Sequence, residues 1–354
     1  MSLAKALERI IREKQVKTGH LSFYDLGLTE IPKEILELEH LTNLYLGSNQ
    51  ILDYSLLEKL TNLSTLDLHS NQISDYSFLE DLRNLSSLDL RANQISDYSF
   101  LEKLPKLSSL DLSYNQISDY SFLDNLTNLS SLYLRSNQIS DCSFLENLTN
   151  LSSLDLRINQ ISDYSFLENL TNLNNLNLRT NQISDCSFLE GLTNLISLDL
   201  RSNQISDISF LKELTRLSTL DLSFNQISDC IFLERLTNLI SLDLCSNQIS
   251  DCNFLGKLIN LTHLDLRSNQ IVEIQNLNNL INLERVWLDD NQIRDIKHLL
   301  PLIRLDKMKV TFEDESDEGY LVLFENPIIN PPIEIITKGN EAIIKYFENL
   351  EIQA

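Results

Sequence analysis

One asparagine returns every 22 residues along this chain, and that spacing limits the fold more than any other feature. It occurs twelve times without a slip, at Asn49, Asn71, Asn93, Asn115, Asn137, Asn159, Asn181, Asn203, Asn225, Asn247, Asn269 and Asn291. A repeat of this length is one supersecondary unit, which buries its apolar side only against the repeats beside it. The chain of 354 residues is therefore predicted to form a repeat array, although its length alone would suggest about two or three compact domains.

The residues around each asparagine follow the pattern L-x-x-L-x-L-x-x-N-Q-I, for example Leu63, Leu66, Leu68, Asn71 and Ile73. This pattern resembles the leucine-rich-repeat family, and the resemblance covers residues 21–326. It implies an α/β fold, a leucine-rich-repeat solenoid (horseshoe) with a parallel β-sheet on the concave face. Short helices are then expected on the convex face, with helical caps at both ends.

The L-x-L segment has the period of a β-strand. Leu66 and Leu68 are expected to point inward, and Thr65, Asp67 and His69 to point outward. Each repeat supplies one such strand, so the strands of successive repeats are predicted to stack about 4.8 Å apart. The repeated asparagine is expected to satisfy buried backbone groups of adjacent turns, because its amide both donates and accepts hydrogen bonds.

The second half of each repeat predicts a short helix. An S-x-x-E capping box occurs at Ser77/Glu80, Ser99/Glu102, Ser143/Glu146, Ser165/Glu168 and Ser187/Glu190. An acid stands just before these positions, where helix N–H groups stabilise it: Asp53, Asp75, Asp97, Asp119, Asp141, Asp163, Asp185, Asp207, Asp229 and Asp251. A phenylalanine column is expected to form an apolar spine: Phe78, Phe100, Phe122, Phe144, Phe166, Phe188, Phe210, Phe232 and Phe254.

The two ends depart from the repeat, as a solenoid with a buried core requires. Residues 1–20 are predicted to form an N-terminal capping helix, with Leu3, Leu7, Ile10 and Ile11 on one apolar face. The repeats span residues 21–326, about twelve of them regular, with an irregular first one that places Leu26 where asparagine belongs and an irregular last one around Met308 and Val310. A hairpin insertion with an acidic loop is expected near 307–325, and a C-terminal helical cap over 327–354.

The C-terminal segment carries a second, narrower resemblance. It contains N-P-x-x-x-P-P-x-E-I from Asn326 and G-N-E-A-I-x-x-Y-F from Gly339, in which Pro331 and Pro332 precede one helix and Asn340 is expected to cap another. This is similar to the segment that closes the repeat region of bacterial Roco proteins, where a Roc GTPase domain follows. No G-x-x-x-x-G-K-[ST] motif occurs, so the resemblance does not bring GTP hydrolysis to this chain.

Charge and hydropathy exclude several classes of partner. The formal net charge is −23, with 28 basic against 51 acidic residues, which disfavours a nucleic-acid partner. No apolar run reaches the ~18 residues of a membrane span, and charges interrupt the N-terminal segment where a signal peptide would be apolar. These features predict a cytoplasmic protein with no membrane partner.

Neither cofactor binding nor catalysis finds support in the sequence. The five cysteines form no disulfide framework, and Cys142, Cys186, Cys230 and Cys252 occupy a core position that Tyr76 holds in another repeat. The five histidines share no metal-ligand spacing, and one aspartate per turn falls short of the six to eight oxygens that calcium takes. We therefore expect a protein that is not an enzyme and holds no cofactor or metal.

Two charged columns follow the outward face of the predicted strands. The acidic column is Asp67, Asp89, Asp111, Asp155, Asp199, Asp221, Asp243 and Asp265, and the basic column is Arg91, Arg135, Arg157, Arg179, Arg201 and Arg267. Two interpretations stay open. The columns either neutralise each other as a structural ladder, or present a polar platform to a partner.

Candidate contact residues combine these columns with departures from the consensus, because Trp, Tyr and Arg are enriched in binding hot spots. They are Tyr133, Arg135, Arg157, Arg179, Arg201, Asp199, His263, Arg285, Trp287 and Asp289. Tyr45, His69, Asn177 and Cys245 also depart from the consensus on this face, as do Tyr114 and Phe224 at the strand edge. Packing against the C-terminal hairpin is the alternative role for Trp287, the single tryptophan.

The sequence therefore predicts a monomeric, non-catalytic protein–protein interaction module that binds a protein or peptide on the concave surface. The first alternative is the recognition region of a bacterial Roco-type signalling GTPase whose Roc domain is absent from this chain. The second is a surface adhesion protein, similar to internalins in repeat length, which would need a secretion signal.

Overall fold

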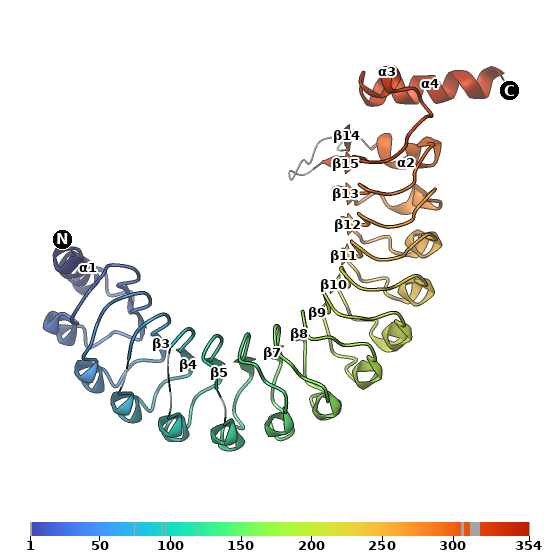
Figure 1. The fold of residues 1–354 in the computed structure, drawn as a ribbon. Coiled ribbons are helices and arrows are strands. Elements are labelled where there is room, and N and C mark those ends of the chain that lie inside the picture. Colours follow the sequence, from blue (N-terminus) through green and yellow to red (C-terminus); the bar gives the residue numbers. More distant parts are fainter. Residues whose placement is uncertain are drawn as a thin grey trace. The chain divides into compact units, whose positions relative to one another are not determined.

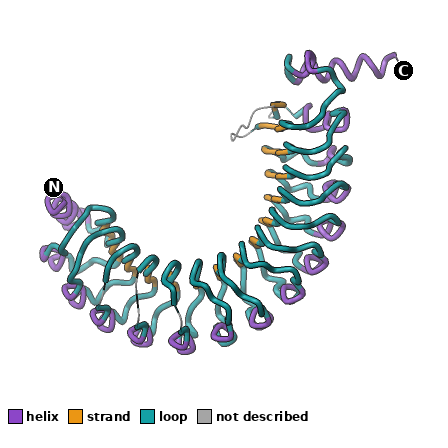
Figure 2. Tube along the Cα trace, in the orientation of Figure 1, coloured by secondary structure: helices purple, strands orange, loops and turns teal. Residues whose placement is uncertain are grey.

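The structure is a computed structural model that describes residues 2–353 except 74, 94, 96, 118, 306–307 and 312–318. The chain divides into two compact units, Met1–Leu173 and Asn174–Ala354, which are described one at a time. In each unit the strands lie side by side along one flank of the coil and the helical turns along the other (Figure 1, Figure 2).

Each repeat contributes one three-residue strand. The first unit holds β1 (His20–Ser22), β2 (Asn43–Tyr45), β3 (Thr65–Asp67), β4 (Ser87–Asp89), β5 (Ser109–Asp111), β6 (Ser131–Tyr133) and β7 (Ser153–Asp155). The second holds β8 (Asn175–Asn177), β9 (Ser197–Asp199), β10 (Thr219–Asp221), β11 (Ser241–Asp243), β12 (His263–Asp265), β13 (Arg285–Trp287), β14 (Lys309–Thr311) and β15 (Tyr320–Val322).

Neighbouring strands pair in parallel and in repeat register within each unit. Leu66 of β3 lies opposite Leu88 of β4, one repeat of 22 residues later, whereas Leu21 of β1 lies opposite Leu44 because the first repeat is one residue longer. These leucines are buried, and the residues beside them face outward. The predicted leucine-rich-repeat solenoid with a parallel sheet is confirmed.

The repeated asparagines form the expected ladder. Asn71 donates from Nδ2 to the carbonyl oxygens of Leu46 and Leu68, at 3.2 and 2.9 Å, and its Oδ1 accepts from the backbone N–H of Asn49 at 3.2 Å. In the second unit the Oδ1 of Asn203 accepts from the N–H groups of Asn181 and Ile183. Each side chain is buried and joins two successive coils, as the sequence predicts.

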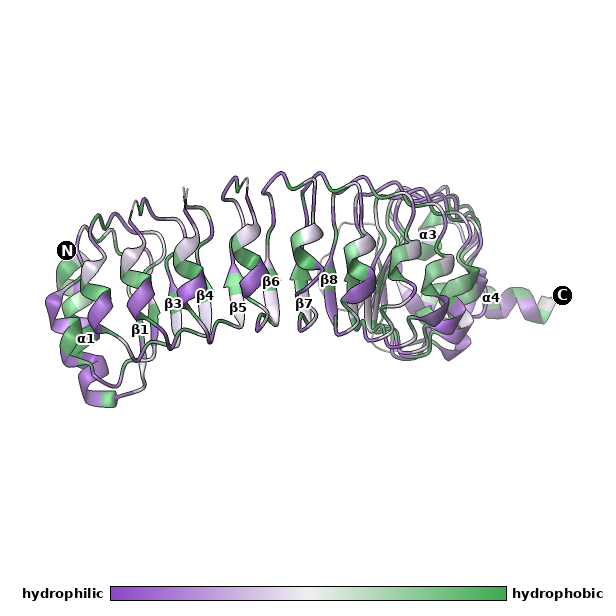
Figure 3. Ribbon diagram, turned by 90° about the horizontal axis from the view of Figure 1, so that it is seen from below, coloured by the Kyte–Doolittle hydropathy of each residue, from purple (hydrophilic) through white to green (hydrophobic). Residues whose placement is uncertain are grey.

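The helix side is built from 3-10 turns. In the first unit they are η1 (Lys33–Glu37), η2 (Ser55–Lys59), η3 (Ser77–Asp81), η4 (Ser99–Lys103), η5 (Ser121–Asn125), η6 (Ser143–Leu145) and η7 (Ser165–Asn169). In the second they are η8 (Ser187–Leu189), η9 (Ser209–Glu213), η10 (Ile231–Arg235), η11 (Asn253–Lys257), η12 (Leu277–Asn279) and η13 (Lys297–Leu299). The turns of the first unit carry both hydrophobic and hydrophilic residues (Figure 3).

The predicted capping boxes are wrong. The residue that precedes η3 is Tyr76, and its side chain makes no capping bond. The backbone N–H of Ser77 donates instead to Oδ1 of Asp75 at 2.9 Å, and this hydrogen bond lowers the pKa of Asp75. A 3-10 turn closes i to i+3 bonds, so the carboxylate two residues back reaches its first free N–H group. The expectation that the acids stabilise these N-termini is confirmed.

Aromatic stacking holds the first-unit turns together. Tyr76 stacks on Phe100 with ring centroids 5.2 Å apart, and Tyr120 stacks on Phe144 at 4.5 Å. In other repeats a cysteine takes the tyrosine position, and all five thiols are free and buried. The prediction that these cysteines fill the core is confirmed.

The N-terminal helix α1 (Ser2–Val16) covers the first coil with a face that agrees with the predicted one only in part: Ile10 is buried and Leu7 part-buried, as expected. It buries Ala6, Ile10 and Glu13, whereas Leu3 is 43% and Ile11 59% exposed. The buried Glu13 accepts hydrogen bonds from Thr18, Gly19 and His40, which offset the loss of its hydration.

The C-terminal end holds α2 (Leu300–Ile303), α3 (Ile333–Ile336) and α4 (Asn340–Gln353). β14 pairs in parallel with β15, which differs from the hairpin expected near 307–325, and residues 313–318 of the acidic loop lie outside the described residues. Asn340 begins α4, and its side chain bonds Ile303, Met308 and Val310. None of the described helices is long and apolar enough to cross a bilayer.

Candidate functional site

The outward side chains of the strands form the surface that we call the strand face. Asp67 and the aspartates at the same position of other repeats make the acid column, and Arg91 and the arginines at the position two residues later make the arginine column. Tyr133, Arg135 and Arg157 lie on the strand face of the first unit. The other seven candidate residues lie on that of the second unit: Arg179, Arg201, Asp199, His263, Arg285, Trp287 and Asp289.

Part of the strand face is a self-neutralised ladder. Arg267 donates from Nε and from a terminal nitrogen to the two carboxylate oxygens of Asp265, at 2.6–3.0 Å. Arg91 binds Asp89 in the same way, and its Nε also lies 3.2 Å from the carboxylate of Asp111. These bidentate pairs leave little charge for a partner.

Three arginines of the arginine column do not form such a bidentate pair with an aspartate. The Nε atoms of Arg135, Arg179 and Arg201 are buried and have no hydrogen-bond partner among the described residues. Tyr133 stands at the acid-column position before Arg135, and Asn177 at the one before Arg179, so neither arginine has a carboxylate at the acid-column position of its own repeat. A buried donor without a partner costs about 1–3 kcal/mol, which an incoming acceptor could recover.

An exposed aromatic ring stands at one strand end in each unit. Tyr114 and Phe224 are each 45% exposed, and each follows a serine that replaces the column arginine. The guanidinium of Arg135 lies 5.0 Å from the Tyr114 ring centroid, and that of Arg201 lies 4.8 Å from the Phe224 centroid. Such cation–π contacts hold the rings in place while leaving them accessible.

The second unit has a gap in the arginine column. The acid column continues through Asp221 and Asp243, but Ser223 and Cys245 occupy the arginine positions. Asp221 accepts from both the N–H and the hydroxyl of Ser223, whereas Asp243 accepts from the N–H of Cys245 at 2.9 Å. Among the described residues, Asp243 has no cation within 4.0 Å.

The environment of this gap disfavours charge on Asp243. Burial raises the pKa of Asp243 to about 7, and the carboxylates of Asp265 and Asp221 add to that effect. Burial also raises the pKa of Asp111 to about 6 in the first unit, but there Arg91 lies within ion-pair distance. Arg201 partly offsets this effect, but no arginine of the column forms an ion pair with Asp243 among the described residues.

Trp287 is part-buried on β13, beside β15 in the sheet. The guanidinium of Arg267 lies 5.6 Å from the centroid of its ring. Asp289 accepts from the N–H of Phe324, and burial raises its pKa to about 6. His263 contacts Thr262 through Nδ1 at 2.7 Å, so its ring is held along the strand.

The contacts of the His69 side chain were not predicted from the sequence. Its ring lies 5.5 Å from that of Tyr24, and its Nδ1 is 2.6 Å from Asp67. A Cβ on Gly47 would lie 2.2 Å from the His69 ring, so only glycine leaves room for it. Asp67, His69 and Asp89 approach one another within 4.8 Å, but Arg91 already neutralises Asp89, which disfavours a metal there.

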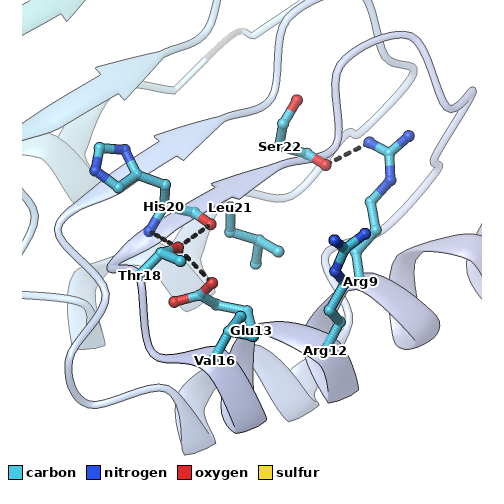
Figure 4. A pocket seen from close by; sticks show the side chains of 8 residues that line it. All are labelled: Arg9, Arg12, Glu13, Val16, Thr18, His20, Leu21 and Ser22. Atoms are coloured by element: carbon cyan, nitrogen blue, oxygen red, sulfur yellow. Dashed lines mark hydrogen bonds between the residues drawn. The ribbon is translucent and has the colours of Figure 1, made fainter.

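A cavity of about 420 Å³ lies between α1 and the edge strand β1 (Figure 4). Arg9 donates to the carbonyl oxygen of Ser22, and Glu13 bonds Thr18, so these polar groups hold α1 on the strand. The cavity lies where the N-terminal helix meets the first strand, and no sequence motif marked it. Its lining residues are Arg9, Arg12, Glu13, Val16, Thr18, His20, Leu21 and Ser22.

Comparison with known families gives a match along most of the repeats. The family described as "Leucine Rich repeats (2 copies)" matches in ten overlapping or adjacent stretches between residues 39 and 301. The chain belongs to the leucine-rich-repeat family. A comparison with proteins of curated function gives no match.

Solved structures of other leucine-rich-repeat proteins share the fold. An internalin, InlF from Listeria monocytogenes, is 36% identical with a TM-score of 0.71, over 87% of this chain and 93% of that one. The protein LIC12759 of Leptospira interrogans is 25% identical with a TM-score of 0.62, over 93% and 96%. A plant peptide hormone receptor, RGFR1 in complex with RGF2, is 24% identical with a TM-score of 0.63, over 87% and 55%.

Proposed function

We propose that this leucine-rich-repeat protein is a non-catalytic interaction module that binds a protein or peptide on its strand face. It acts as a monomer without a cofactor, and neither nucleic acid nor membrane is its partner. The leucine-rich-repeat fold commonly serves protein–protein interaction. A rigid, preformed sheet surface also lowers the ordering cost of association.

The observation that carries this proposal is the set of arginine-backed aromatic rings on the strand face. Phe224 stands beside Arg201, and Trp287 beside Arg267. Phe224 is exposed and Trp287 part-buried, and tryptophan and arginine are among the residues enriched in binding hot spots.

The test is affinity capture of proteins and peptides with three forms of the chain. The strand-face variant carries Arg179→Ala, Arg201→Ala and Trp287→Ala. The matched control carries Lys212→Ala, Arg216→Ala and Ile231→Ala, which remove two cations and one exposed apolar residue outside the strand face.

A partner retained by the parent and the control, and lost by the strand-face variant, supports the proposal. Circular dichroism must show that all three forms are folded. A partner lost by the control and kept by the strand-face variant would move the site to the helix side. No partner for any form would count against a stand-alone binding module.

The Roco-type alternative is supported by the sequence resemblance of residues 326–347 only. It predicts that a GTPase domain acts with this chain, either downstream in the same gene or in trans. Sequencing past codon 354 tests the first form. A purified Roc domain that fails to bind this chain counts against the second.

A further inference from the structure

We infer that the gap in the arginine column of the second unit receives a lysine or arginine from an extended segment of the partner, with an apolar side chain of that segment resting on Trp287. This inference rests on the proposed function and names the chemistry of the partner. The gap is formed by Asp221, Asp243, Ser223 and Cys245 on β10 and β11 and the residues that follow them.

Charge complementarity identifies the missing group. Arg267 neutralises Asp265 in the neighbouring repeat with a guanidinium placed two residues later. The same position beside Asp243 holds Cys245, a small side chain whose thiol contacts Ser246. A cation supplied by a partner would occupy the place that the consensus gives to arginine, and no existing pair would have to break.

The surrounding groups decide how that cation is held. Asp221 and Asp265 lie beside Asp243 on the two adjacent strands. Arg201 stacks on Phe224 and makes no ion pair among the described residues, although its charge favours the ionised form of Asp243, and Arg267 is held by Asp265. The partner's cation therefore faces three carboxylates, of which one is already paired.

Strand spacing sets the length of the recognised segment. Trp287 lies two strands beyond Asp243 at the same position of the repeat, a distance of about 10 Å. An extended chain that crosses the strands covers this distance in about three residues. We expect a lysine or arginine and, three positions away, an aliphatic or aromatic residue.

The first unit contains a similar arrangement of side chains that serves as a control for the gap. Asp111, Ser113 and Tyr114 repeat the arrangement of Asp221, Ser223 and Phe224, but Arg91 lies 3.2 Å from Asp111. An added arginine at position 113 should therefore have no effect on the partner. The same addition at position 245 should block the gap.

The experiment selects binders from a display library of random peptides on the immobilised parent protein, and then measures their Kd by fluorescence anisotropy. We expect enrichment of lysine or arginine three residues from an apolar residue. Cys245→Arg should weaken binding about tenfold or more, because a charge-assisted contact is lost, while Ser113→Arg changes it less than about twofold. Asp243→Asn, which keeps the side-chain shape, should weaken it in the same direction.

Other outcomes overturn the inference in distinguishable ways. Peptides that the strand-face variant loses but Cys245→Arg and Asp243→Asn still bind would reject the cation in the gap and leave the proposed function intact. Peptides indifferent to all three variants would reject both. If calcium or magnesium alone raised the thermal unfolding midpoint of the parent but not that of Asp243→Asn, a metal ion would be the occupant of the gap and the inference would be wrong. If the parent dimerised and Cys245→Arg abolished the dimer, a second copy of this chain would be the occupant of the gap.

Discussion

The substitution Asp243→Asn should stabilise the folded protein, although it removes a charged residue from a sheet. The folded-state pKa of Asp243 is about 7, against an ordinary value of 3.8. That difference corresponds to about 4 kcal/mol of destabilisation once pH exceeds 7. Because the carboxylate is only part-buried, solvent screening should reduce the gain to about 1–2 kcal/mol.

The stabilisation by Asp243→Asn should increase with pH. The folded state holds the proton more tightly than the unfolded state, so the folded state loses stability as pH rises from about 4 to about 7. Asparagine does not titrate. The difference in free energy of unfolding between Asp243→Asn and the parent should therefore be small near pH 4, grow with pH, and level off above pH 7.

The assay is urea denaturation at pH 5.5 and pH 8, followed by circular dichroism. The control is Asp265→Asn in the same column, which loses the bidentate contact with Arg267 and should destabilise the protein by about 1–2 kcal/mol. The two variants thus have opposite expected signs. If Asp243→Asn destabilised the protein at pH 8, or if its effect did not depend on pH, the account of the gap would be refuted.

Three further predictions concern the fold. Asn137→Ala should cost about 3–6 kcal/mol in urea unfolding, because it leaves two buried carbonyls and a backbone N–H without their partner; a loss below about 1 kcal/mol would contradict the ladder. Gly47→Ala should cost about 1–3 kcal/mol by displacing the ring of His69, and the same change in a His69→Ala background should be nearly neutral. The five thiols should react with Ellman's reagent at pH 8 only after unfolding, since burial raises the pKa of Cys230 to about 12; rapid reaction of the native protein would show that the cysteine core is open.

The period made the strand side of the fold predictable. With Leu66 and Leu68 two residues apart and an asparagine three residues later, only one register buries both leucines, and the structure adopts it in each unit. The role of the asparagine also followed from its chemistry, since few side chains donate and accept within one buried turn.

The helical turns and the ends were less predictable, because their geometry depends on contacts that no repeat encodes. The S-x-x-E pattern suggested a cap at Ser77, but the backbone N–H of Ser77 at the start of this five-residue 3-10 turn donates to Asp75. The apolar pattern of α1 pointed to Leu3 and Ile11, yet the helix buries Glu13 because residues distant in sequence supply its hydrogen bonds.

The strand face could be predicted as two charged columns but not as a set of contacts. The repeat spacing places an arginine two residues after half of the column acids, and Arg267 pairs with Asp265 as that spacing suggests. Arg201 does not, because an aromatic ring at position 224 offers its guanidinium another partner. Which arginines pair and which stack depends on side-chain packing across neighbouring coils, which the repeat pattern does not contain.

The irregular positions are better candidates for recognition than the consensus for an energetic reason. A partner that binds at Asp265 must compete with a bidentate arginine, and breaking that pair would leave one charge without its counter-ion. A partner that binds at Asp243 meets a carboxylate that has no such arginine, so its cation relieves an existing cost. A uniform ladder is thus inert toward charged partners, and departures such as Cys245 are what could give this repeat surface its specificity.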